Sequence, residues 1–231
     1  MDSNKTALLI FTRTAASEIQ HKTMLRKGAS QNQKLVLTQE LINRTRKLGA
    51  QSGLNVVVCT DFNQHGETFG KRLSNAISET FAKGYREVIA IGTDTPALSL
   101  SHINRAVLSV QNQNIVLGPS TDGGIYLIGI HRKAFNPNSF ESLPWLTSNV
   151  YEALLQQSLN KGNEAVSLET LSDIDDVQSL YTAMSELKCT DQFYKLSLQF
   201  LVEPIVPFPI SSQIPSFYDG LAIGLRAPPT A

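Results

Sequence analysis

Residues 88–96 read Val-Ile-Ala-Ile-Gly-Thr-Asp-Thr-Pro, and this stretch decides the fold class. Its first half is an apolar, largely β-branched run, which predicts a strand buried on both faces, as in parallel sheets covered by helices. Gly92 ends the run, and the single carboxylate of Asp94 follows at the strand's exit. In open α/β sheets, ligands bind just beyond the carboxyl ends of the strands. Asp94 is therefore the first candidate functional residue, because a carboxylate placed there can hold a hard divalent cation.

A second informative stretch, Gly-Pro-Ser-Thr-Asp-Gly-Gly at residues 118–124, lies between two further apolar runs. It is too short for a helical crossover, so it predicts a hairpin or an inserted antiparallel strand. Asp122 followed by Gly123 is a common turn signal. Gly123 and Gly124 also allow the backbone to approach a ligand closely. The loop is thus interpreted both as a turn and as a second candidate site.

Strand and helix patterns alternate along the chain, which favours an α/β fold with a mostly parallel central sheet. A capping role is expected for Asp175, directly before the last predicted helix. Apolar runs predict strands at residues 7–11, 55–59, 87–91, 114–117, 125–130 and 165–168. Helical spacing predicts helices at residues 33–49, 67–83, 99–113, 149–160 and 176–187.

Composition narrows the classes of function. The 231 residues carry 20 basic and 20 acidic side chains, which gives no support for a nucleic-acid partner. No apolar stretch approaches the ~20 residues of a membrane span. The two cysteines form no metal-ligand pattern, and we expect a cytoplasmic protein. Most prolines fall late in the chain, so residues 1–190 are expected to form one domain and residues 191–231 a Pro-rich extension that packs on it or on a partner.

Four motifs occurring in order resemble a known family. They are Gly-Thr-Asp-Thr-Pro-Ala-Leu at 92–98, Gly-Pro-x-x-Asp-Gly-Gly-x-Tyr-Leu-x-Gly at 118–129, Trp-x-Thr-x-x-Val at 145–150, and Asp-x-Asp at 173–175. Together they are similar to the bacterial glycosyltransferase-like family often labelled as arsenosugar-biosynthesis glycosyltransferases, within the nucleotide-diphospho-sugar transferase superfamily. The resemblance implies a GT-A-like (Rossmann-like) three-layer αβα sandwich. It also implies a metal-dependent transferase that uses a nucleotide-sugar donor and a small-molecule acceptor.

The resemblance also implies roles for single residues. Asp94 and Asp122 would be catalytic, and Asp94 and Asp175 would hold Mg²⁺ or Mn²⁺. Substrate contacts would fall to Lys22, Thr93, Gly123, Gly124, Trp145 and Thr147. Five of these residues have a plainer interpretation as well: turns for Asp94 and Asp122, a helix cap for Asp175, solvated surface for Lys22 and packing for Trp145.

Residues 12–25 depart from the family pattern. The family has Lys-x-Pro-x-x-Gly-x-x-Lys-Thr-Arg-Leu after its first strand; here Lys22 and Thr23 match, and the proline and the glycine are absent. Met24 stands where the arginine is expected, and a thioether cannot replace a bidentate phosphate donor. Arg13 or Arg26 could take over that role in space.

Three interpretations therefore remain open. The first is a glycosyltransferase. The second is a nucleotidyltransferase acting on a small phosphorylated or sugar substrate, and the third is a catalytically eroded nucleotide-binding relative. The sequence gives no oligomeric state, and a homo-oligomer is compatible with it.

Overall fold

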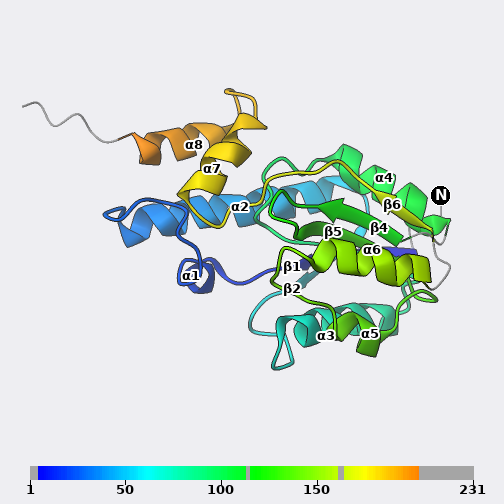
Figure 1. Cartoon of the computed structure of the whole chain (residues 1–231). Coiled ribbons are helices and arrows are strands. Elements are labelled where there is room, and N and C mark those ends of the chain that lie inside the picture. Colours follow the sequence, from blue (N-terminus) through cyan, green and yellow to red (C-terminus); the bar gives the residue numbers. More distant parts are fainter. Residues whose placement is uncertain (1–4, 113–114, 161–163, 203–231) are drawn as a thin grey trace, which may run out of the picture.

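A six-stranded sheet forms the centre of the molecule (Figure 1). The computed structural model describes residues 5–112, 115–160 and 164–202. The strand order is β2-β1-β3-β5-β4-β6. The strands are β1 (Thr6–Phe11), β2 (Asn55–Cys59), β3 (Glu87–Ile91), β4 (Ile115–Pro119), β5 (Ile125–His131) and β6 (Ala165–Ser167). The predicted strands are confirmed to within two residues at each end, apart from position 114, which lies outside the described residues.

The sheet is mostly parallel, as predicted. β1 pairs in parallel with β2 and β3, and β4 pairs in parallel with β6. β5 runs antiparallel to both β3 and β4, which confirms that the Asp122 loop joins an inserted antiparallel strand. This reversal places the start of β5 beside the end of β3, with Ile91 opposite Leu127. The exits of β1, β3 and β4 therefore meet the Asp122 loop at one edge of the sheet.

Helices cover both faces of the sheet, which completes the three-layer αβα sandwich (Figure 1). Successive strand residues point to opposite faces, so Leu9 packs in the cluster under α3 while Leu8 packs in the cluster under α4. Both leucines are fully buried. The helices are α1 (Ala15–Glu18), α2 (Gln31–Gln51), α3 (Phe69–Ala82), α4 (Leu100–Gln111), α5 (Pro137–Glu141), α6 (Val150–Asn160), α7 (Val177–Ser185) and α8 (Gln192–Leu201).

A third apolar cluster lies beyond the end of the sheet, where α7 and α8 pack over α2 (Figure 1). It contains Met24, Leu180 and the fully buried Phe193. Helix α8 was not predicted from the sequence. It lies at the start of residues 191–231, which were predicted to form a Pro-rich extension. The Pro-rich part of that segment, residues 203–231, lies outside the described residues, so the predicted extension stays a prediction.

The starts of α7 and α3 differ from those expected, and α2 begins two residues earlier than predicted, at Gln31. The cap of α7 is Asp176, whose side chain accepts a hydrogen bond from the Ser179 backbone N–H. The prediction that Asp175 caps this helix was therefore wrong. Helix α3 begins at Phe69 behind the cap of Thr68, two residues later than expected. For α7 and α3, neighbouring residues compete as caps, and sequence alone does not choose among them. Within the described ranges, none of the helices has the length and apolar character needed to cross a membrane.

Candidate active site

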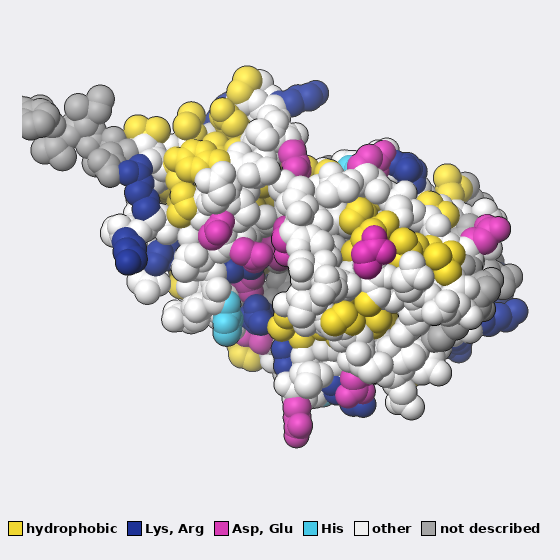
Figure 2. All heavy atoms as spheres, viewed as in Figure 1, with side chains coloured by type: hydrophobic (Ala, Val, Ile, Leu, Met, Phe, Trp, Pro, Cys, Tyr) yellow, Lys and Arg dark blue, Asp and Glu magenta, His cyan; other side chains and the backbone are white. Residues whose placement is uncertain are grey.

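A cavity of about 390 Å³ opens at the sheet edge where the strand exits meet the Asp122 loop. In the space-filling view, acidic and basic side chains gather around a hollow on this face (Figure 2). Among the residues predicted as site residues, eight line the cavity: Lys22, Thr93, Asp94, Asp122, Gly124, Trp145, Thr147 and Asp175. Gly123, predicted to contact substrate, is not among the lining residues.

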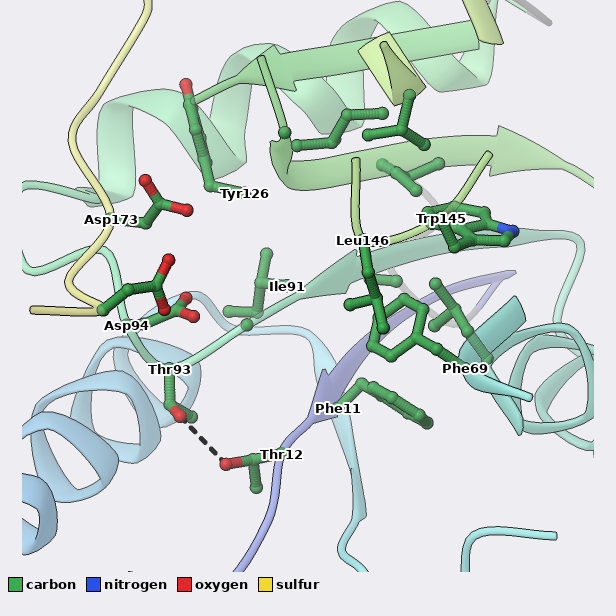
Figure 3. A pocket seen from close by; sticks show the side chains of 18 of the residues that line it. Phe11, Thr12, Phe69, Ile91, Thr93, Asp94, Tyr126, Trp145, Leu146 and Asp173 are labelled. Carbon is green, nitrogen blue, oxygen red and sulfur yellow. Dashed lines mark hydrogen bonds between the residues drawn. The ribbon is translucent and has the colours of Figure 1, made fainter. Parts of the chain in front are cut away.

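The first loop of the site is a short helical turn instead of a glycine-rich loop. Thr14 caps α1, and its backbone N–H donates to the Asp61 carboxylate at 2.9 Å. The hydroxyl groups of Thr12 and Thr93 lie 2.9 Å apart, which joins the exits of β1 and β3 (Figure 3). A regular helical turn needs neither the proline nor the glycine of the family motif, which accounts for their replacement here.

Two arginines line the cavity, Arg13 and Arg72, and Arg13 is one of the two considered from the sequence as a substitute for the missing arginine. The Arg13 guanidinium lines the cavity and pairs with Glu18 at 3.1 Å. Met24, which stands at the family's arginine position, is 2% exposed and packs in the cluster under α7. Arg13 is thus available to an anion in the cavity, as one of the two substitutes considered from the sequence.

The segment from Leu171 to Asp176 carries two acidic residues of the site and holds the loops of the other two beside them. Its Ile174 N–H donates to the Asp94 carbonyl at 3.0 Å, and the Thr23 N–H donates to the Asp175 carbonyl at 2.8 Å. Farther back, the Thr121 N–H donates to the Leu171 carbonyl at 3.0 Å. These backbone bonds join three loops that are distant in sequence, and they bring Asp94, Asp122, Asp173 and Asp175 to one end of the cavity.

Lys22 lies among these acids. Its Nζ is 2.8 Å from Asp94 Oδ2, 3.0 Å from Asp175 Oδ1 and 3.5 Å from Glu18 Oε1. It also donates to the Ile174 carbonyl at 2.6 Å, and its side chain is 8% exposed. Burial works to lower the pKa of Lys22, but the surrounding carboxylates outweigh it and raise that pKa. In the same way, burial works to raise the pKa of Asp94, and Lys22 lowers it. The pair is therefore ionised on both sides.

A second acidic set lies beside this ion pair. Carboxylate oxygens of Asp122, Asp173 and Asp175 lie within 4.8 Å of one another. Burial, followed by the charges of Asp94, Asp122 and Asp175, raises the pKa of Asp173 to about 7. Because hard oxygen donors at this spacing suit Mg²⁺ or Mn²⁺, these three residues could hold a divalent ion. The predicted pair of ligands was Asp94 with Asp175; Asp173 was given little weight, although Asp-x-Asp before a helix was the available signal.

The Asp122 loop is both a turn and a wall of the cavity. The Gly124 N–H donates to Asp122 Oδ1 at 2.7 Å, which closes a local turn. Gly123 has φ +86°, and a Cβ there would lie 2.1 Å from the Ser148 carbonyl oxygen. Its own carbonyl accepts from the Tyr151 N–H at 3.3 Å. Through this close contact and this hydrogen bond, Gly123 packs the loop against the segment that carries Trp145 and Thr147.

The other end of the cavity is apolar. Figure 3 shows Phe11, Phe69, Trp145 and Leu146 at the end away from Asp94 and Asp173. Of these four, only Trp145 was predicted from the sequence. Phe11 and Phe69 match ordinary core positions of a strand and a helix, and the sequence gives no sign of the Leu146 conformation described below.

Solved structures resemble this chain to different degrees, and the match to the first one described here shows a shared fold. A crystal structure described as a "putative nucleotide-diphospho-sugar transferase" from Desulfovibrio desulfuricans G20 matches with a TM-score of 0.72 and 19% identity, over 86% of this chain and 99% of that chain. A nucleotidyl transferase from Methanothermobacter thermautotroptrophicus matches at 0.42 and 14%, over 77% and 95%. The manganese complex of Rv0371C from Mycobacterium tuberculosis H37Rv matches at 0.42 and 13%, over 79% and 100%.

The GT-A-like fold class predicted from the sequence is therefore confirmed. No curated protein matches the sequence. The model of a family described as "Uncharacterized protein conserved in bacteria (DUF2064)" matches residues 24–147, which is more than half of the chain. The protein therefore belongs to the DUF2064 family.

Proposed function

We propose that this protein is a transferase that moves a sugar from a nucleotide-diphospho-sugar to a small-molecule acceptor, with the help of a divalent cation. The observation that carries the proposal is the meeting of Lys22, Arg13 and four aspartates at one end of a cavity beyond the strand exits. Basic groups and a metal-binding acidic set in one place fit a diphosphate leaving group, which needs charge neutralisation.

The diphosphate would lie between Lys22, Arg13 and the cation. The Lys22 ammonium is engaged by Asp94, Asp175 and the Ile174 carbonyl, so it would contact a phosphate when one of these carboxylates moves to the cation. Arg13 offers a planar pair of donors, which suits a phosphate group. Reaction would then depend on positioning and on fixed charge, with no covalent nucleophile required.

The cation would be held by Asp175 together with Asp173 and Asp122, whose oxygens are mutually close. Asp94 was predicted as a ligand, and it would join this set on release of its contact with Lys22. When bound, the ion would supply positive charge to the departing diphosphate. Carboxylate oxygens favour Mg²⁺ or Mn²⁺ over softer metals.

Asp122 would face the acceptor. It lies on the loop that packs against the Trp145–Ser148 segment, and its carboxylate also borders Asp173 and Asp175. We infer that the Asp122 carboxylate oxygen that does not bind the cation takes the proton of the acceptor hydroxyl, while the hydroxyl oxygen bonds to the sugar carbon and the bond from that carbon to the diphosphate breaks. The base of the nucleotide, the sugar and the acceptor are not assigned by these contacts.

We also propose that the protein belongs with the arsenosugar-biosynthesis glycosyltransferases. This placement rests on the motifs at residues 92–98, 118–129 and 145–150. Against it stands the replaced first loop, where Arg13 would have to serve for the missing arginine.

The test is a reaction panel. Purified protein is incubated with each common nucleotide-sugar and Mn²⁺, and release of nucleoside diphosphate is measured. A parallel set offers nucleoside triphosphates with sugar phosphates, and release of pyrophosphate is measured. Asp122→Asn removes the proposed base, and Glu79→Gln removes an exposed acid on α3 as the matched control.

Release of a nucleoside diphosphate that depends on Mn²⁺, falls at least about tenfold in Asp122→Asn and persists in Glu79→Gln supports the proposal. Release of pyrophosphate alone identifies a nucleotidyltransferase and overturns it. Absence of turnover with every donor points to a catalytically eroded relative and overturns it as well.

A further inference from the structure

The apolar end of the cavity is built from four side chains, called here the apolar wall: Phe11, Phe69, Trp145 and Leu146 (Figure 3). The rings of Phe11 and Phe69 meet edge to face at 5.7 Å, and those of Phe69 and Trp145 lie 5.5 Å apart. The wall comes from the end of β1, the start of α3 and the segment before α6. It faces the same cavity as the acidic end, so one ligand could touch both.

Leu146 is the unusual member of the wall. Its φ is +62°, the only positive φ of a non-glycine residue in the part of the chain that the structure describes. A leucine in this left-handed conformation carries backbone strain, because its Cβ crowds the neighbouring carbonyl oxygen. Its side chain gains little by packing in return, because the residue is 78% exposed. Strain that packing does not repay is a reason to seek a ligand for the side chain.

The hydrogen-bond donors around the apolar wall are already bonded within the protein. The Trp145 indole N–H donates to the Phe140 carbonyl at 2.8 Å, so it is already used. The Trp145 backbone N–H donates to the Leu143 carbonyl at 2.7 Å, and the Thr147 hydroxyl donates to the Pro144 carbonyl at 2.7 Å. These bonds hold the segment in place, and they leave the wall a preformed hydrocarbon surface.

Such a surface offers no hydrogen-bond partner to the polar edges of a sugar or a nucleobase, so it could bind only the face of either by stacking. It does suit an aromatic ring or an alkyl chain, which gains by leaving water. Through Gly123 and Ser148 the wall adjoins the loop of Asp122, the carboxylate assigned to the acceptor.

We propose that the acceptor is an alcohol with an apolar ring or chain, and that the apolar wall binds this group while Asp122 faces the hydroxyl. This proposal rests on the transferase function proposed above, because the ligand is an acceptor only if the protein transfers a sugar to it. The binding surface itself can be tested without donor or metal.

Trp145 is the only tryptophan of the chain, so its fluorescence reports directly on the wall. The probe is 2-phenylethanol, titrated into the full-length protein, with glycerol as a polar alcohol control. Leu146→Asn removes the apolar side chain while keeping a residue that tolerates positive φ. Leu108→Asn is the matched control, because Leu108 is an exposed leucine on α4 that does not line the cavity.

A saturable change of Trp145 emission with 2-phenylethanol and none with glycerol is expected. We expect Leu146→Asn to weaken this binding about tenfold, corresponding to a buried leucine, and Leu108→Asn to leave it unchanged. Absence of saturation, or equal binding by Leu146→Asn, overturns the proposal. Displacement of 2-phenylethanol by a free nucleoside also overturns it, because the wall would then belong to the base.

The two proposals fail in different ways. If 2-phenylethanol does not bind while a nucleotide-sugar is turned over, the apolar acceptor is wrong and the transferase stands. If 2-phenylethanol binds but no nucleotide-sugar is turned over, the transferase is wrong, and with it the assignment of this surface to an acceptor.

Discussion

The ammonium group of Lys22 lies 2.8 Å from the carboxylate of Asp94, two residues that are 72 positions apart in the sequence. The same ammonium reaches Asp175 and Glu18, so one cation balances part of a dense acidic site. This arrangement keeps Lys22 charged and oriented at the place where a diphosphate is proposed to bind. It also makes the site sensitive to any change in its charge balance.

Replacing Lys22 with methionine should destabilise the protein by about 3 kcal/mol, because it leaves partly buried carboxylates without their cation. The measurement is urea unfolding at neutral pH. Mn²⁺ should recover part of the loss, since a divalent ion can supply the missing positive charge.

The matched control is Lys71→Met. Lys71 pairs with Glu141 at 2.8 Å, but the Lys71 side chain is 42% exposed where that of Lys22 is 8% exposed, so the loss should be about 1 kcal/mol or less. Equal losses for the two variants would show that the Lys22 cluster has no special place in stability.

The carboxyl of Asp173 gives a prediction about pH. Its pKa in the folded protein is about 7, above the ordinary value of 3.8, so the folded state holds this proton more tightly than the unfolded state. Protonation of Asp173 therefore contributes fully to the free energy of unfolding at low pH, and this contribution is lost as the pH rises through 7. Asp173→Asn should therefore be more stable than the wild type at about pH 8, by about 2 kcal/mol, with a smaller difference at about pH 5.

Unfolding curves of both proteins at the two pH values, without added metal, check this. A difference that grows toward low pH would contradict the assigned pKa. Saturating Mn²⁺ should reverse the order at high pH, because the wild type keeps the ligand that Asp173→Asn has lost.

Gly123 should tolerate no side chain. Gly123→Ala combines a strained φ of +86° with a Cβ placed 2.1 Å from the Ser148 carbonyl oxygen, and we expect a loss of about 3 kcal/mol. Gly84→Ala is the control, since Gly84 has φ +101° and open space around it. It should lose only about 1 kcal/mol, from backbone strain alone. Thermal unfolding of both variants gives the comparison, and similar losses would show that the contact with Ser148 does not matter.

Much of the fold could be predicted because its signals are local. The run from Val88 to Ile91 is apolar at every position, and β3 is buried at every position. The short spacing around Asp122 forced an antiparallel connection, which the structure has. The position of Asp94 beside a cavity followed from the rule that ligands bind just beyond the carboxyl ends of the strands.

The rest depended on contacts that no local pattern reveals. Lys22 was predicted to touch a phosphate, and its ion pairs with Asp94 and Asp175 arise from the path of residues 171–176 across the strand exits. Asp176 caps α7 because its own backbone is the extended one before the helix, and the sequence does not show which of the adjacent Asp175 and Asp176 takes that position. The conformation of Leu146 has no sequence signal, since leucine is a residue that normally avoids positive φ.

The central claim is that the acidic end of the cavity binds a metal-bound diphosphate. The most direct measurement is calorimetric titration of the wild type and Asp175→Asn with each common nucleoside diphosphate, with and without Mn²⁺. The account predicts that at least one nucleoside diphosphate binds the wild type only with Mn²⁺, and that Asp175→Asn binds it at least about tenfold more weakly, a change of about 1.4 kcal/mol. Binding that is equally tight without metal, or equally tight in Asp175→Asn, or no binding of any nucleoside diphosphate, would contradict it.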